Sequence, residues 1–82
     1  MNININDILT FDNGEYLVVD IIDDRYLYLI NNDILKNDIA IVKIVNKYNN
    51  IEINNIDNDD EFNYVIYKLY LKNKKNILNY FE

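Results

Sequence analysis

Two runs of mostly apolar residues flank a pair of aspartates, and this pattern predicts a β-hairpin over residues 16–32. The turn falls at Asp23 and Asp24, because aspartate tolerates the positive backbone angle that a tight hairpin requires. If these two residues form the whole turn, Ile22 lies opposite Arg25 in the sheet. The hairpin is the segment that the rest of the chain has to accommodate.

Both faces of this hairpin are rich in apolar side chains, because directly opposed residues share a face. One face is apolar throughout and carries Leu17, Val19, Ile21, Tyr26, Tyr28 and Ile30. The other is mixed and carries Tyr16, Val18, Asp20, Ile22, Arg25, Leu27 and Leu29. A bulge or a three-residue turn would exchange the faces of one strand. In either register, another element must cover the second face.

Further strands surround the hairpin in the sequence. The expected strands cover about residues 7–11, 16–22, 25–31, 39–46 and 50–54. The only glycine, Gly14, closes a turn that begins with Asp12 and Asn13. The polar connection before the fourth strand contains Ile34 and Leu35, which we expect to anchor it in the core.

The apolar spacing becomes helical after residue 57. One helical face carries Phe62, Val65, Ile66, Leu69 and Tyr70. Asn58 and Glu61 match a capping box, and acids in the first turn suit the positive end of the helix dipole. The pattern predicts a helix over about 59–72. After it, Asn73–Asn76 either break the helix before a further helical turn over about 75–81 or allow it to continue.

These elements predict a single α+β domain over residues 1–82. We expect a strongly bent five-stranded antiparallel sheet or open barrel, SH3-like or OB-like in size, with the C-terminal helix packed on it. A chain of 82 residues can bury roughly 60% of its unfolded surface, which suffices for a modest core. No signal-peptide pattern or membrane-spanning apolar run is found, so we expect a cytoplasmic protein.

The composition leaves few side chains for catalysis. The chain has no His, Cys or Ser, so the usual nucleophile–base pairs are absent. Thr10, the one aliphatic hydroxyl, is interpreted as an ordinary strand residue. Fourteen acidic residues make carboxylate pairs frequent by chance, and one glycine is too few for a phosphate-binding loop. We therefore expect no enzymatic activity and no cofactor.

The acidic segment from Asp57 to Glu61 invites a calcium interpretation, because carboxylate and amide oxygens bind hard cations. It departs from the EF-hand template, since Phe62 stands where glycine is required and Lys68 stands in place of the bidentate glutamate. Capping of the helix explains these acids without a metal, so we predict no metal site.

The order of motifs resembles that of a known group of proteins. The segments DILTFDNGEYLVVDIIDDRYLYLINN and IEINNIDNDDEF, the latter preceding a helix, are similar to short acidic proteins of Firmicutes and their mobile elements. Those families of unknown function share the order strand, turn, EYxVV, turn, YxYL and a late acidic helix start. The resemblance covers roughly Asp7 to Leu69. It implies a non-enzymatic protein of a bacterium or a phage-infected cell and transfers no catalytic residues.

Charge is distributed unevenly along the chain. The net charge is −6, but residues 1–67 hold thirteen acids and four basic residues, whereas residues 68–82 are basic. An acidic body attracts basic protein grooves, including those that hold nucleic acid, and many CRISPR inhibitors occupy such grooves. The residues expected to form this partner-binding face are Asp57, Asp59, Asp60, Glu61, Asp23 and Asp24. The alternative is that acidity only keeps a bacterial housekeeping protein in solution.

Two other surfaces are predicted. Small barrels bind single-stranded nucleic acid through aromatic faces, and the residues for such a contact are Tyr26, Tyr28, Lys72, Lys74 and Lys75. The acidic body repels a polyanion, so direct nucleic-acid binding is the second choice. The C-terminal apolar residues either complete the core or pair with another copy in a homodimer. They are Ile77, Leu78, Tyr80 and Phe81.

Overall fold

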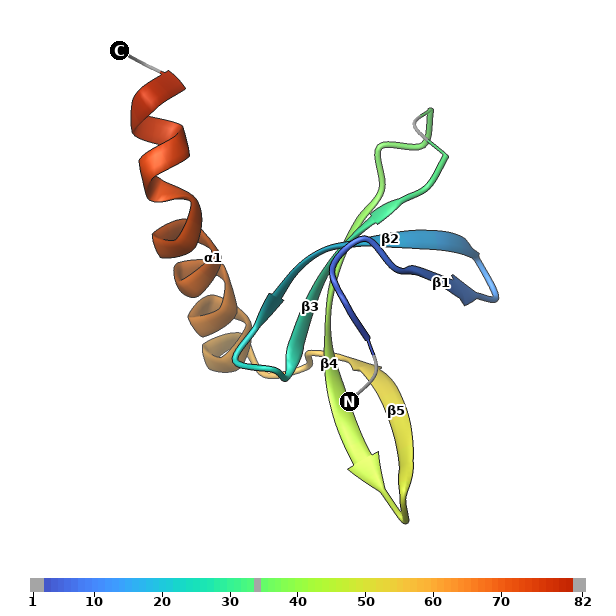
Figure 1. The fold of residues 1–82 in the computed structure, drawn as a ribbon. Helices are drawn as coiled ribbons and strands as arrows, with labels where there is room; N and C mark the ends of the chain where they lie inside the picture. The colour runs from blue at the N-terminus through green and yellow to red at the C-terminus, as the bar shows by residue number, and fades with distance from the viewer. Residues whose placement is uncertain (1–2, 34, 81–82) are drawn as a thin grey trace.

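The computed structural model shows a curled five-stranded antiparallel sheet, a half-barrel, followed by one helix (Figure 1). It describes residues 3–33 and 35–80, with the helical side chains described as far as Asn73. The strands follow each other in the sheet in chain order: β1 (Ile8–Phe11), β2 (Gly14–Ile22), β3 (Tyr26–Asn31), β4 (Ile39–Lys47) and β5 (Asn50–Asn55). The helix α1 spans Asp59–Tyr80. The predicted α+β fold with a strongly bent sheet is confirmed.

Helix α1 begins at the predicted residue but continues to Tyr80. Of the two alternatives for the segment after Asn73–Asn76, the structure shows the continued helix. Asparagine costs about 0.7 kcal/mol or less at a helical position, and this segment contains no proline or glycine. The Asn73 amide also donates a 2.9 Å hydrogen bond to the Leu69 carbonyl, which keeps its side chain within the helix. Across residues 3–33 and 35–80, no helix is both long and apolar enough to span a bilayer.

The hairpin turn contains three residues, which is the alternative to a two-residue turn, so Ile22 does not pair with Arg25. Asp23 and Asp24 both have a φ of 55°, and the Arg25 N–H donates to the Ile22 carbonyl at 3.0 Å. Ile22 instead pairs with Tyr26. The Arg25 carbonyl accepts a 2.7 Å hydrogen bond from Ile44 of β4, which holds Arg25 in the turn as an additional residue.

A β-bulge at Val19 compensates for the longer turn. The register shifts between Val18 and Asp20, so Leu17 still pairs with Ile30 as predicted. A bulge adds one residue and exchanges the faces of the strand beyond it. Ile21 consequently joins the interior of the half-barrel, and the predicted placement of Ile21 on the face of Tyr26 is wrong.

Two apolar clusters lie on opposite faces of the sheet. The interior cluster contains Tyr16, Val18, Leu27, Leu29, Val42 and Ile44, with Leu9 and Phe11 of β1 and Ile53 of β5 packed against it. The outer cluster contains Ile22, Tyr26, Val65 and Leu69. Helix α1 thus covers the second apolar face of the hairpin, as its composition requires.

The connection between β3 and β4 is held by polar groups. The Asn31 N–H donates to the Asp38 carbonyl at 2.8 Å, and the Tyr16 hydroxyl donates to the Asp38 carboxylate at 2.5 Å. Leu35 is 87% exposed, so its predicted role as an anchor is wrong. Ile34 lies outside the described residues. The connection projects from the sheet (Figure 1), and its closing hydrogen bonds make an apolar anchor unnecessary.

We predict that Leu69→Ala lowers the free energy of unfolding by about 2–4 kcal/mol, because it leaves a cavity between α1 and the hairpin. Urea denaturation followed by circular dichroism measures the change. The control is Leu35→Ala, which should change the free energy of unfolding by less than about 0.5 kcal/mol because that side chain is exposed. Equal effects of the two substitutions would contradict the helix packing described above.

Candidate protein-binding site

An open groove of about 750 Å³ lies between the hairpin turn, β4 and the first turns of α1. It brings together three of the predicted acidic residues, Asp23, Asp24 and Glu61, from two distant segments of the chain. Arg25 and Lys43 also line it. We call this feature the acidic groove.

Glu61 is held in the acidic groove by two donors. The Tyr26 hydroxyl donates to its Oε2 at 2.9 Å, and the Lys43 ammonium donates to its Oε1 at 3.2 Å. These hydrogen bonds lower the pKa of Glu61 below its ordinary value. Burial, followed by the hydrogen bond to Glu61, raises the pKa of Tyr26. Lys43 therefore compensates the charge of Glu61, which acts as a structural carboxylate between the sheet and the helix.

The hairpin turn is attached to the helix by Tyr64. Its hydroxyl donates a hydrogen bond to the Asp23 carboxylate, and this bond raises the pKa of Tyr64. The rings of Tyr64 and Tyr26 lie 6.4 Å apart, and the Lys68 ammonium lies 5.7 Å from the centre of the Tyr64 ring. A cation at that distance is attracted by the ring face. The turn is thereby fixed relative to the helix.

The start of α1 is capped as predicted, but by half of a capping box. Asn58 accepts a 3.0 Å hydrogen bond from the Glu61 N–H through its side-chain oxygen. The Glu61 side chain does not complete the box, because it points into the acidic groove. The five predicted acids other than Glu61 are all exposed, on the hairpin turn and around the helix start. We call them the acidic end: Asp23, Asp24, Asp57, Asp59 and Asp60.

Among the residues predicted for nucleic-acid contact, those whose side chains the structure describes do not form a common exposed surface. Tyr26 is 6% exposed, and Tyr28 packs beside it against the outer cluster. The Tyr26 ring offers no free face for base stacking, and Tyr28 is half-buried. Lys72 is engaged in an ion pair within the fold, and the side chains of Lys74 and Lys75 lie outside the described residues.

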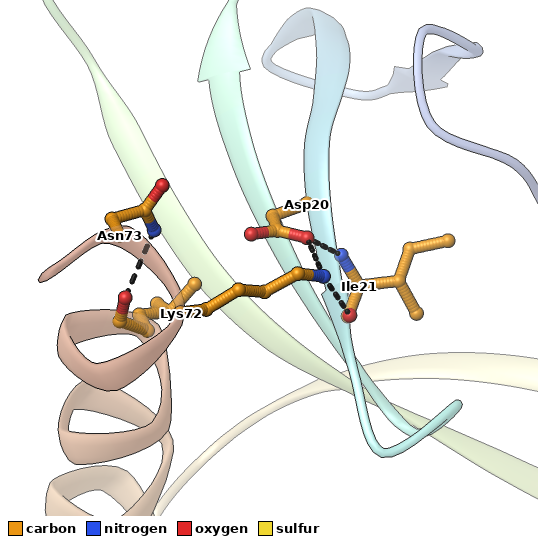
Figure 2. A network of polar contacts seen from close by, with 5 residues as sticks. Asp20, Ile21, Lys72 and Asn73 are labelled. Atoms are coloured by element: carbon orange, nitrogen blue, oxygen red, sulfur yellow. Dashed lines mark hydrogen bonds and ion pairs between the residues drawn. The ribbon is translucent and has the colours of Figure 1, made fainter. Parts of the chain in front are cut away.

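Asp20 and Lys72 form an ion pair that the sequence pattern did not reveal. The Lys72 ammonium lies 2.5 Å from Oδ1 of Asp20, which also accepts a 2.8 Å hydrogen bond from the Ile21 N–H (Figure 2). Asp20 is 8% exposed, and a carboxylate at that depth requires a compensating charge. The pair attaches the middle of α1 to β2. Its partners are 52 residues apart, and no local pattern joins them.

Lys43, Tyr64 and Arg25 were not predicted as site residues from the sequence. A signal existed for Tyr64, since it follows Glu61 by three residues and so shares its side of a helix. Lys43 of β4 lies opposite Tyr26 of β3 in the sheet. This register depends on the packing of the whole sheet, so no local sequence signal indicated Lys43.

The metal prediction and the self-association prediction concern two further parts of the chain. In the described ranges, no group of three or more acidic side chains is arranged to hold a metal ion. Among the residues predicted for self-association, the side chains of Ile77, Leu78 and Tyr80, and all of Phe81, lie outside the described part.

No protein-family model, curated protein or solved structure matches this chain. The resemblance to short acidic proteins of Firmicutes stays a prediction.

We predict that Tyr26→Phe raises the pKa of Glu61 toward its ordinary value of 4.5, because the substitution removes the hydrogen bond that lowers it most. Since the folded-state pKa is depressed, this carboxylate stabilises the fold above its unfolded pKa. That contribution is lost as the pH falls through the folded-state pKa. Stability should therefore decline less steeply below about pH 4.5 in the variant.

The measurement is a carboxyl-carbon NMR titration of Glu61, with urea denaturation at each pH. Tyr67→Phe is the matched control, because Tyr67 is 59% exposed on the outside of α1. An unchanged pKa of Glu61 in Tyr26→Phe would show that the hydroxyl does not set the charge of this groove.

Proposed function

We propose that this chain is a non-catalytic protein-binding module that inserts its acidic end into a basic groove of a partner. The main support is that five exposed carboxylates from two distant segments lie at one end of the fold. The hydrogen bonds from Tyr64 to Asp23 and from Tyr26 to Glu61 fix these two segments relative to each other. A fixed arrangement of charges loses less conformational entropy on binding than a flexible acidic tail.

The charge of the acidic end supports a basic partner. Clustered carboxylates raise the local potential and steer a cationic surface toward this end. Arg25 is an exposed basic residue beside them, whereas Lys43 already compensates Glu61. The acidic end therefore keeps an excess of negative charge.

The proposed partner is a protein that handles nucleic acid. Its groove is built to accept phosphates at regular spacing, and a rigid set of carboxylates presents similar charge. By occupying such a groove, the chain acts as an inhibitor, in the manner of CRISPR inhibitors from phages and mobile elements. The buried ring of Tyr26 and the acidic surface argue against the chain itself binding nucleic acid.

We predict that combining Asp23→Asn, Asp24→Asn and Asp57→Asn weakens binding to the partner at least tenfold at about 50 mM salt, with a smaller effect at high salt. Asparagine retains the positive φ of the turn, so charge is removed without straining the backbone. The partner is first captured from nuclease-treated host lysate and identified. Its affinity for the purified wild-type and variant chains is then measured by isothermal titration calorimetry.

The matched control removes three charges elsewhere, through Asp12→Asn, Glu15→Gln and Asp33→Asn. These exposed residues lie on the β1–β2 hairpin and in the β3–β4 connection, away from the start of α1 (Figure 1). The control should bind nearly as tightly as the wild type. Equal losses in the two variants, or an affinity unaffected by salt, would overturn the proposed role of the acidic end.

A further inference from the structure

Helix α1 is covered by the sheet along a small part of its surface. Between Asp59 and Asn73, its buried residues are Val65 and Leu69. Its C-terminal part runs away from the strands (Figure 1), and the radius of gyration is 13.7 Å, against about 12 Å for a compact chain of this length. The fold therefore presents a long helix whose outer side has no covering element among the described residues.

The outer side of α1 carries large apolar residues. Phe62, Ile66 and Tyr70 follow at intervals of four, which places them along one ridge, and Tyr67 lies beside it. These four residues, which we call the outer stripe, are between 39% and 59% exposed. A surface helix normally presents polar residues to water, and a contiguous apolar patch marks an interaction site. The outer stripe is therefore a candidate interface.

We propose that the outer stripe pairs with the outer stripe of a second copy of this chain, with the two helices antiparallel. The charge along the helix selects this occupant and this direction. Asp59 and Asp60 precede the stripe, whereas the sequence places four lysines between residues 68 and 75, of which Lys72 also pairs with Asp20 of the same chain. An antiparallel pair sets the acidic start of each helix beside the basic half of the other. A parallel pair sets like charges side by side.

The stripe also has the symmetry that such a pair requires. A two-fold axis near Ile66 and Tyr67 places residue 59 of one copy beside residue 74 of the other. The same surface then serves both copies, as in a closed dimer. At about 200 Å² per large side chain, the exposed parts of the stripe amount to roughly 400 Å² per copy. That is about half of the 800 Å² per partner of a standard interface, so the charged residues on either side of the stripe supply the rest of the contact.

This inference goes beyond the proposed function and is tested without any other protein. In the antiparallel pair the two acidic ends lie far apart, and the hairpin turns remain exposed. Both proposals use Asp59 and Asp60, but the variants that test them change different residues. The stripe substitutions keep every acid of the acidic end, and the substitutions at Asp23, Asp24 and Asp57 keep the stripe, so a failure of one proposal is distinguishable from a failure of the other.

The first test is sedimentation velocity of the full chain between about 1 and 200 μM, a range that brackets a micromolar dissociation constant. We expect a reversible change from the 9.9 kDa monomer to a species of twice that mass. Ile66→Lys combined with Tyr70→Lys should weaken dimerisation at least tenfold and keep the wild-type circular dichroism spectrum, since both side chains are exposed in the monomer.

The matched control is Leu35→Lys combined with Ile39→Lys, which changes two exposed apolar residues outside the stripe and should still dimerise. A wild-type chain that stays monomeric throughout the range would overturn the proposal and leave the stripe to a different protein. Dimerisation that survives the stripe substitutions would overturn it as well.

Cysteine cross-linking tests the direction, because the chain has no native cysteine. Tyr67→Cys lies near the proposed axis, so its copies should form a disulfide under mild oxidation. Asp59→Cys residues of an antiparallel pair are about 20 Å apart along the helices and should not cross-link. Both directions bring the two Tyr67→Cys residues together, so the Asp59→Cys variant decides between them. Cross-linking of Asp59→Cys would show a parallel pair and overturn the proposal.

Discussion

Burial of the outer face of the β2–β3 hairpin beneath α1 is the contact on which the rest of this structure depends. Ile22 and Tyr26 of the hairpin meet Val65 and Leu69 of the helix. Each large side chain removed from water stabilises a fold by about 1.5–3 kcal/mol, against a net stability of about 5–15 kcal/mol for a domain. A five-stranded sheet with apolar side chains on both faces therefore needs this helix.

The same contact builds the acidic groove. When Tyr26 packs under the helix, its hydroxyl meets Glu61, and when the first turns of α1 lie over the sheet, Tyr64 meets Asp23. These polar bonds align the hairpin turn with the helix start. The carboxylates that are proposed to recognise a partner are thus positioned by apolar packing, and the same packing makes the acidic end rigid.

The relative directions of the elements explain why two different surfaces coexist. The longest strands and α1 are each about 30 Å long, but the C-terminal part of α1 runs away from the strands (Figure 1), so the sheet does not cover the helix along its length. An isolated helix is marginally stable in water, and tertiary packing supplies most of its stability. The molecule therefore presents a charged surface where helix and sheet meet and an apolar surface on the outer side of the helix.

The sequence by itself determined the local features of this protein. Period-two and helical spacing located the strands and the start of α1, the paired aspartates located the hairpin turn, and Asn58 located the helix cap. The acids of the candidate site were also predictable, because exposed charge on turns and helix starts follows from composition. All these features depend on residues within a few positions of each other.

Only the tertiary structure decided the features that join distant residues. The Arg25 carbonyl bonds to β4, which lengthens the turn, and the bulge at Val19 then turns Asp20 toward Lys72. The Glu61 side chain accepts hydrogen bonds from Tyr26 and Lys43 of the sheet and therefore does not cap the helix. Register and helix placement decide which side chains meet, and both result from the packing of the whole sheet, which no short stretch of sequence contains.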